Sequence, residues 1–158
     1  MIPRAGVPLT EVLLLTLWMG AAVLFIAVVA PAAFLVLPTR TLAGALVARV
    51  LPVIFYAGVV IGAAIVVLDI AGRTGAWGRT AAGALSALAC AVAQLVVGTR
   101  IDRLRSAIGG PLEALAADDP RRAAFGRLHA FSVGWLAVAM IAAIVALALA
   151  IRALHPKS

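Results

Sequence analysis

The sequence predicts an all-α integral membrane protein: a bundle of four transmembrane helices that forms a single domain over residues 1–158. Hydrophobic residues make up 65% of the chain and charged residues 12%, whereas soluble domains average about 45–50% apolar and about 25% charged residues. In addition, four segments contain no Asp, Glu, Lys or Arg. These segments are residues 12–39, 50–68, 80–99 and 130–151.

The four uncharged segments are 28, 19, 20 and 22 residues long, and a helix of about 20 apolar residues crosses a hydrocarbon core of about 30 Å. None of them alternates polar with apolar residues as a membrane-barrel strand does. Because backbone groups in lipid must satisfy their own hydrogen bonds, each segment is expected to be a helix. We place the spans at about residues 8–30, 52–69, 79–99 and 129–152.

Prolines and charged residues predict where these helices begin and end. Pro31 and Pro38 are expected to end or kink the first span, because proline interrupts helical hydrogen bonding. Residues 39–51 carry two arginines, which predicts an interfacial helix before the second span. The third span is expected to continue as a helix to Arg105, and a helical loop follows it. Asp119 and Pro120 then predict a helix start, with an acidic cap and a proline at the first position.

The formal net charge is +7, but the basic residues lie in the loops between spans, so we expect no nucleic-acid partner. The side that carries the loop at residues 100–129 holds eight of the 13 Lys and Arg residues. The positive-inside rule places this side in the cytoplasm and both termini outside. We expect a protein of the bacterial inner (plasma) membrane whose partners are the lipid bilayer and, at this loop, anionic lipid headgroups.

Small residues four positions apart predict close helix packing. Gly58 and Gly62 form such a pair on the second span, and Gly20 forms one with Thr16 on the first. In lipid these pairs allow helix backbones to approach closely. The expected role is packing within the bundle. The alternative is a seam between copies of the chain, which would make the protein a homo-oligomer or part of a larger membrane complex.

The third span carries a polar stripe whose members are about one helical turn apart and therefore share a face. Its members are Ser86, Cys90, Gln94, Gly98, Asp102 and Arg105. A polar face on a membrane helix is expected to point into the bundle. Gln94 would then form hydrogen bonds between helices. The alternative is a polar cavity or ligand path along this face.

The densest group of polar residues lies where the third span leaves the membrane and the fourth enters it. Arg100, Asp102 and His129 are predicted to form a small site at this mouth of the bundle, with a solvated basic loop as the alternative. The full set of candidate functional residues is Gln94, Arg100, Asp102, Arg105, Arg127, His129 and Ser132.

The sequence contains no recognisable catalytic set and no metal-binding motif, so we expect no enzyme activity, no bound metal and no cofactor. His129 and His155 are 26 residues apart, which is about 39 Å along one helix, so they cannot ligate the same haem. Met19, Cys90 and Met140 lie near the middle of their spans, where sulfur ligands could hold Cu(I). Such residues more often fill gaps in apolar packing.

Three groups of motifs occur in order along the chain: Leu17-Trp18-x-Gly20 with Ala30-Pro31-x-x-Phe34, then Arg100-Ile101-Asp102-Arg103-Leu104-Arg105, then Phe125-Gly126-Arg127-Leu128-His129 with Ser132. With these motifs the chain resembles the uncharacterised four-span family similar to transmembrane protein 205 (domain of unknown function 4149). The resemblance implies a four-helix membrane fold without an established activity. It marks as candidate family positions Trp18, Gly20, Pro31, Phe34, Arg100, Asp102, Leu104, Arg105, Arg127, His129 and Ser132.

A looser likeness extends to copper-resistance D and HemJ-type four-helix proteins, whose first span also has a tryptophan–glycine step. HemJ-type proteins place a haem-ligating histidine in that span, whereas residues 11–25 contain none. Three classes of function follow. We expect first a protein that acts through helix packing or a partner. The second class is a small-solute transporter or exporter that uses the polar face of the third span, and the third is a haem- or copper-dependent redox protein.

Overall fold

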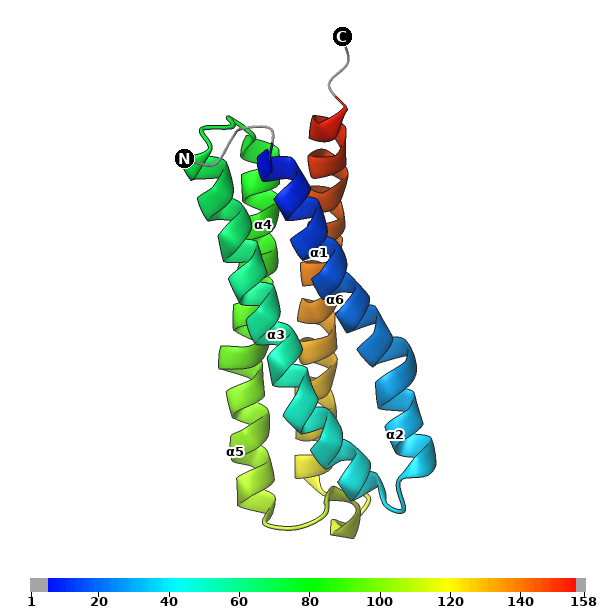
Figure 1. Cartoon of the computed structure of the whole chain (residues 1–158). Helices are drawn as coiled ribbons and strands as arrows, with labels where there is room; N and C mark the ends of the chain where they lie inside the picture. The colour runs from blue at the N-terminus through cyan, green and yellow to red at the C-terminus, as the bar shows by residue number, and fades with distance from the viewer. Residues whose placement is uncertain (1–5, 156–158) are drawn as a thin grey trace.

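The computed structural model of the chain describes residues 6–155, which form four helical rods joined by short connections (Figure 1). The rods span Gly6–Val36, Arg40–Ala71, Trp77–Ile108 and Pro120–Leu154, and each is long and apolar enough to cross a membrane. No strand occurs within the described residues. The predicted fold class, an all-α membrane bundle of four spans, is therefore confirmed.

The first rod consists of α1 (Gly6–Leu24), a π-helical segment η1 (Phe25–Val29) and α2 (Ala30–Val36). Of the two prolines expected to end or kink the first span, Pro31 lies inside the rod and does not end it. The π-helical segment stops just before α2, which puts Pro31 in the first turn of a helix, where a missing N–H group is tolerated. The rod ends instead at Leu37, whose backbone is extended, because the following Pro38 disfavours helical geometry there.

α3 (Arg40–Ala71) is one continuous helix. It is capped by Thr39, whose hydroxyl oxygen accepts a hydrogen bond from a first-turn backbone N–H group at 3.2 Å. Residues 40–51 are helical as expected, but they continue directly into the span instead of forming a separate interfacial helix. Pro52 lies inside α3 and removes one backbone hydrogen bond. The helix continues through this proline to Ala71, and Phe55, about one turn later, is buried in the core.

The third rod consists of α4 (Trp77–Ala91), a π-helical segment η2 (Val92–Gly98) and α5 (Thr99–Ile108). It extends through Arg105, as predicted. Gly109 ends it with a left-handed φ of 67°, and its N–H group donates to the carbonyl oxygen of Arg105 at 3.1 Å, a common C-terminal cap. The loop that follows holds one short 3-10 helix, η3 (Leu112–Ala114).

The last rod, α6 (Pro120–Leu154), begins as predicted. The Asp119 carboxylate accepts a hydrogen bond from the backbone N–H of Arg121 at 2.8 Å, and Pro120 occupies the first turn. The inner side of α6 is lined by small residues, and the buried alanines at positions 139, 143 and 146 let it pack closely against α1 and α4.

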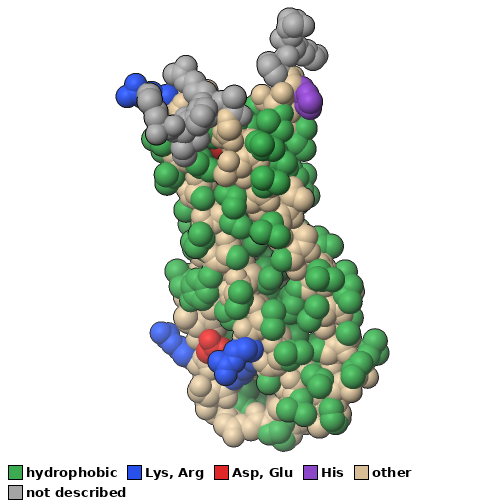
Figure 2. All heavy atoms as spheres, viewed as in Figure 1, with side chains coloured by type: hydrophobic (Ala, Val, Ile, Leu, Met, Phe, Trp, Pro, Cys, Tyr) green, Lys and Arg blue, Asp and Glu red, His purple; other side chains and the backbone are tan. Residues whose placement is uncertain are grey.

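The core lies between α1, α3, α4 and α6 and combines two large side chains, Trp18 and Phe55, with the alanines of α6. α3 and α4 approach closely at Gly62, where a Cβ atom would lie 2.6 Å from the carbonyl oxygen of Gly83. On the visible face, hydrophobic side chains extend along the molecule, while arginine side chains lie toward its ends (Figure 2). An apolar surface of this kind is typical of helices that face lipid.

Candidate functional site

A cavity of about 70 Å³ lies between α3, the η2–α5 part of the third rod, and α6. Its polar lining consists of Gln94, Asp102, Arg105, His129 and Ser132. Its apolar lining includes Leu51 and Phe55 from α3, Ile101 from α5 and Phe125 from α6. The structure therefore brings five of the seven candidate functional residues together around one cavity.

The polar stripe of the third rod supplies three of these residues. Gln94 lies in the π-helical segment η2, and Asp102 and Arg105 follow on α5. Gly98 also lines the cavity, and a Cβ atom there would lie 3.4 Å from Nε2 of Gln94, so the glycine leaves room for this amide. Single π-helical turns inside α-helices frequently occur at functional sites.

Aromatic contacts hold the basic side chains at the cavity. The rings of Phe125 and His129 are stacked, with centroids 6.4 Å apart and an interplanar angle of 2°. The guanidinium carbon of Arg105 lies 5.3 Å from the Phe125 ring centroid, a cation–π contact. Within residues 6–155, the side chains of Gln94, Asp102, Arg105 and His129 form no ion pair and no hydrogen bond with protein groups. Their polar atoms are therefore free to bind water or a ligand.

Two of the predicted residues lie away from this cavity. Arg100 is exposed and does not line it. Arg100 precedes Asp102 by two positions, which separates the two side chains by about 200° around the helix. The predicted trio of Arg100, Asp102 and His129 therefore does not form, and Arg105 supplies the guanidinium group instead. Arg127 is also exposed, and it lines a separate groove on α6.

This α6 groove is open and has a volume of about 640 Å³. Its lining consists of Arg127, Ala130, Phe131, Gly134, Trp135 and Val138. Ala130 and Gly134 are four positions apart and share a face, and a Cβ atom at Gly134 would meet nothing within 4 Å. The groove is therefore wide enough for an apolar chain or another helix to approach the α6 backbone.

Beyond the cavity, the polar stripe has a structural role in the middle of the bundle. Ser86 is buried, and its hydroxyl group donates to the carbonyl oxygen of Ala139 on α6 at 3.2 Å. Cys90 is buried beside Gly58 of α3. Both contacts join the third rod to its neighbours, as expected for a polar face that points inward.

The small-residue pairs differ in their surroundings. Gly58 and Gly62 are buried, and a Cβ atom at either position would collide with α1 or α4. Gly20 is exposed, with no atom within 4 Å of such a Cβ, so it makes no packing contact within the bundle. The inward face of α1 is instead occupied by Trp18, whose Nε1–H donates to the carbonyl oxygen of Ile54 at 2.9 Å.

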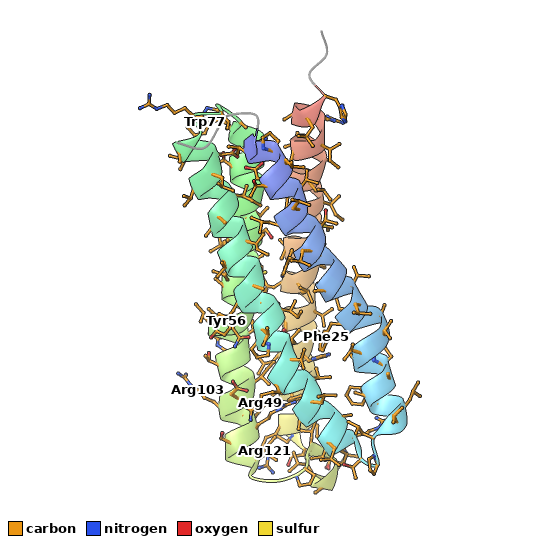
Figure 3. All side chains as sticks on the ribbon, in the orientation of Figure 1. Phe25, Arg49, Tyr56, Trp77, Arg103 and Arg121 are labelled. Carbon is orange, nitrogen blue, oxygen red and sulfur yellow. The ribbon has the colours of Figure 1, made fainter. Side chains whose placement is uncertain are left out.

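A second polar cluster lies at the opposite end of the bundle, where α1, α3 and α4 meet, and it was not anticipated. Glu11, Asp69 and Arg79 are buried there, with exposed fractions of 0%, 3% and 3%. Figure 3 shows Trp77, at the start of α4 near this cluster, and Arg103, on the helix that lines the cavity, toward opposite ends of the molecule. The three cluster residues stand at the ends of three different spans. A four-span topology puts those ends on one side, and this is the signal that could have revealed the cluster.

The structure offers few candidates for metal or haem ligands. Among residues 6–155, no group of three or more His, Cys, Asp and Glu side chains could hold a metal ion. Both histidines are exposed; His129 lines the open side of the cavity, and His155 lies at the end of α6. Met19 and Met140 pack against the core that contains Cys90.

Comparison with known protein families gives a match over most of the first three rods. Residues 13–109 match the family described as domain of unknown function (DUF4149). No curated protein and no solved structure matches the chain. The matched segment contains Gln94, Asp102 and Arg105 and ends before α6, so His129 and Ser132 lie outside it. Because the match covers more than half of the sequence, this four-helix membrane protein belongs to the DUF4149 family.

Proposed function

We propose that the protein binds a small anionic solute in the cavity between α3, α5 and α6 and carries it across the membrane. The proposal rests on the surroundings of the Arg105 guanidinium group. Its guanidinium group lines the cavity beside Phe125, and no carboxylate of the described residues pairs with it. Guanidinium groups bind anions through short, charge-assisted hydrogen bonds. Gln94, His129 and Ser132 add further polar groups around the same space, and the carboxylate of Asp102, which is exposed, also lines it.

The size of the cavity limits the solute. A cavity measured in this way needs about 10–15 Å³ to hold one water molecule, so a cavity of about 70 Å³ has room for an anion with a few non-hydrogen atoms, such as acetate. The apolar side chains on the α3 side of the cavity favour a short carbon chain over a fully polar ion. The same volume is far too small for a haem, which disfavours the redox alternative.

Transport is supported by the direction of the polar stripe. From the cavity the stripe continues along the third rod through Cys90 to Ser86, which are both buried in the middle of the bundle. A polar face at this depth is typical of a solute pathway as well as of helix packing. The solute would enter at the end of the bundle that carries the loop at residues 109–119.

The test is binding of acetate, with inorganic phosphate for comparison, to the purified protein in lipid nanodiscs. We expect acetate to raise the thermal unfolding temperature, because a ligand at 100 times its dissociation constant stabilises the folded state by about 2.7 kcal/mol. Arg105→Gln and His129→Gln should lose this shift. Arg100→Gln should keep it, since Arg100 is an exposed arginine five residues earlier on the same helix, outside the cavity.

Two outcomes would reject the proposal. One is the absence of any shift with either anion in the unmodified protein. The other is an equal shift in Arg105→Gln and Arg100→Gln, which would place binding outside the cavity. Uptake of labelled acetate into proteoliposomes then separates a transporter from a protein that only binds the solute.

A second candidate function is assembly with another copy of the chain through the α6 groove. It is favoured by the exposed Ala130 and Gly134 pair beside Trp135, because small residues next to a large one allow close helix contact in lipid. Chemical cross-linking of the protein in native membranes would detect the dimer. Gly134→Leu should abolish the cross-linked species, whereas Gly20→Leu, on the exposed side of α1, should not.

We place the protein in a bacterial plasma membrane, with the loop at residues 100–129 in the cytoplasm and in contact with anionic lipid headgroups. The excess of arginines at that end of the bundle supports this placement. The likeness to transmembrane protein 205 is compatible with the proposal and adds no activity of its own.

A further inference from the structure

The buried cluster at the end of the bundle opposite the cavity contains one carboxylate, that of Asp69, whose oxygens accept several hydrogen bonds. Asp69 forms an ion pair with Arg79, whose Nε lies 3.0 and 3.2 Å from its two carboxylate oxygens. The hydroxyl groups of Thr74 and Thr80 also donate to Asp69, at 2.8 and 3.0 Å. These donors all favour the ionised form of the Asp69 carboxyl group.

The other carboxylate of the cluster has no hydrogen bond. Glu11 is fully buried, and neither of its side-chain oxygens accepts a hydrogen bond. Oε2 of Glu11 lies only 2.8 Å from Nε of Arg79. The single hydrogen on that nitrogen, however, is directed at Asp69. A buried carboxylate in this state is costly, because it has lost water without gaining a donor.

The charges around Glu11 do not balance. Two carboxyl groups share one guanidinium group, so the cluster carries one excess negative charge if both are ionised. Arg73, in the turn next to the cluster, is exposed. α6 packs against α1 and α4 and contributes buried alanines at this level, and it has no titratable residue between His129 and Arg152. Within the described residues, no second cation compensates Glu11.

We infer that Glu11 is a proton-binding site, which carries a proton at neutral pH and exchanges it with water at this end of the bundle. The proton removes the excess charge and gives Glu11 an O–H group that can donate to the Asp69 carboxylate. It is taken up from water and returned to water, so the step needs no other reactant. A metal cation fits less well, because the guanidinium group of Arg79 already lies against both carboxylates.

The sequence allows a direct observation of this one group. The chain has two glutamates, Glu11 and Glu113. Glu113 is exposed in the loop at the other end, where it accepts a hydrogen bond from Thr41 at 3.1 Å. In the Glu113→Gln variant Glu11 is therefore the only glutamate, and glutamine preserves the acceptor oxygen. Labelling this variant with glutamate that carries carbon-13 in its side-chain carboxyl group marks the infrared bands of Glu11 alone.

The experiment is infrared spectroscopy of the labelled variant in lipid vesicles. We expect the C=O band of a protonated carboxyl group at neutral pH, shifted to lower frequency by the label. The band should shift again in heavy water and disappear as the pH is raised into the alkaline range. Glu11→Gln in the same background should lack the labelled band and should unfold at a temperature that no longer falls with increasing pH.

The inference is overturned if the labelled variant shows only the ionised carboxylate at neutral pH. It is also overturned if the C=O band of the protonated carboxyl group changes neither in heavy water nor at alkaline pH, because the Glu11 proton would then not exchange with water. These measurements concern the labelled protein itself. They remain conclusive if Glu11→Gln does not fold, and they are independent of any solute bound at the distant cavity.

Discussion

Arg79 and Arg105 illustrate how differently this bundle surrounds two guanidinium groups. Arg79 is 3% exposed and lies against two carboxyl groups at one end of the bundle. Arg105 is partly exposed at the other end and rests on the ring of Phe125, with no carboxylate partner among residues 6–155. The first arrangement is typical of an interaction that holds helices together. The second leaves donors for a ligand.

Substitution of these two arginines should therefore have unequal effects on stability. Arg79→Gln leaves two buried carboxyl groups without their cation, and breaking a buried ion pair in this way costs about 3–5 kcal/mol. Arg105→Gln breaks no ion pair of the described residues and should cost about 1 kcal/mol, in the range of an exposed cation–π contact. Thermal unfolding in detergent compares them. Equal losses would contradict the structural role of Arg79.

The charge count at Glu11 gives a second prediction at this scale. Asp69→Asn removes one of the two carboxylates, so that Glu11 and Arg79 form a one-to-one pair. In the labelled Glu113→Gln background we expect this change to abolish the protonated Glu11 band at neutral pH. Asp102→Asn, which alters an exposed acid at the other end, should keep the band. Persistence of the band in Asp69→Asn would show that burial alone, without the excess charge, holds the proton.

At the scale of the helices, two features set the spacing and the rotation of the rods. α3 and α4 touch at Gly62, where a Cβ atom would lie 2.6 Å from a backbone oxygen and 2.8 Å from a backbone nitrogen of α4. Backbone atoms cannot move aside as a flexible side chain can. The π-helical segment η2 has more residues per turn than an α-helix, so it reduces the rotation between Ser86 and Asp102 and helps to determine which stripe residues face α6 at the cavity.

Glycine-to-alanine changes should consequently differ in sign between two positions. Gly62→Ala forces α3 and α4 apart, and overpacking of this kind costs about 1–3 kcal/mol. Gly20→Ala adds a methyl group in open space and should be neutral or stabilising by up to about 1 kcal/mol, because alanine has the higher helix propensity. Thermal unfolding of both variants in the same detergent tests this. A stable Gly62→Ala protein would show that the two backbones are not in contact.

The start of α6 should respond to acid. The side-chain hydrogen bond from Arg121, with its backbone N–H, lowers the pKa of the Asp119 carboxyl to about 2, from the ordinary value of 3.8. A lowered pKa means that the ionised cap stabilises the folded helix above pH 3.8 and that this contribution disappears as the pH falls toward about 2. The Arg121 amide should therefore lose protection against hydrogen exchange over this range, relative to its intrinsic rate.

Asp119→Asn is the matched control, because asparagine caps helices well without titrating. Its Arg121 amide should keep the same protection throughout the acid range. A parallel loss of protection in both proteins would show that the acid acts elsewhere in the structure.

At the scale of the whole molecule, exposed positive charge is concentrated at the end that carries the cavity. Exposed arginines of this end include Arg49, Arg103 and Arg121, which Figure 3 shows toward one end of the bundle. At the other end, Arg79 is buried and neutralised, and Arg73 and Arg152 are exposed. Arg4 and Lys157, which belong to the same charge count, lie outside the described residues. The burial of Arg79 strengthens the asymmetry on which the predicted orientation rests.

We expect the cavity end to face the cytoplasm. Single cysteines at Ser106 and His155, both exposed, would be introduced into a Cys90→Ala background. A membrane-impermeant thiol reagent added to intact cells should label position 155 and leave position 106 unlabelled until the cells are opened. The reverse pattern would invert the orientation and place the proton-binding cluster on the cytoplasmic side.

The sequence alone determined the number of spans, the class of fold and several helix ends. These properties depend on residues within one segment: a run of about 20 apolar residues must span as a helix, and the Asp119–Pro120 start of α6 and the Gly109 end of α5 are local signals. The effect of Pro31 was not local in this sense. The helix continues through it because a π-helical segment precedes it, and no local sequence pattern predicts that segment.

Only the tertiary structure decided which polar residues meet. Arg100 and Arg105 are the same type of residue on the same helix, but the rotation of α5 relative to α6 places Arg105 at the cavity and Arg100 outside it. Gly20 and Gly62 are equally small, yet only Gly62 lies at a helix contact. Asp69 and Arg79 lie ten positions apart on either side of one turn, but Glu11, which meets them, comes from the first span, far away in the sequence. Their meeting depends on the pairing, rotation and relative depth of the helices, which are set by packing between segments rather than by the composition of any one of them.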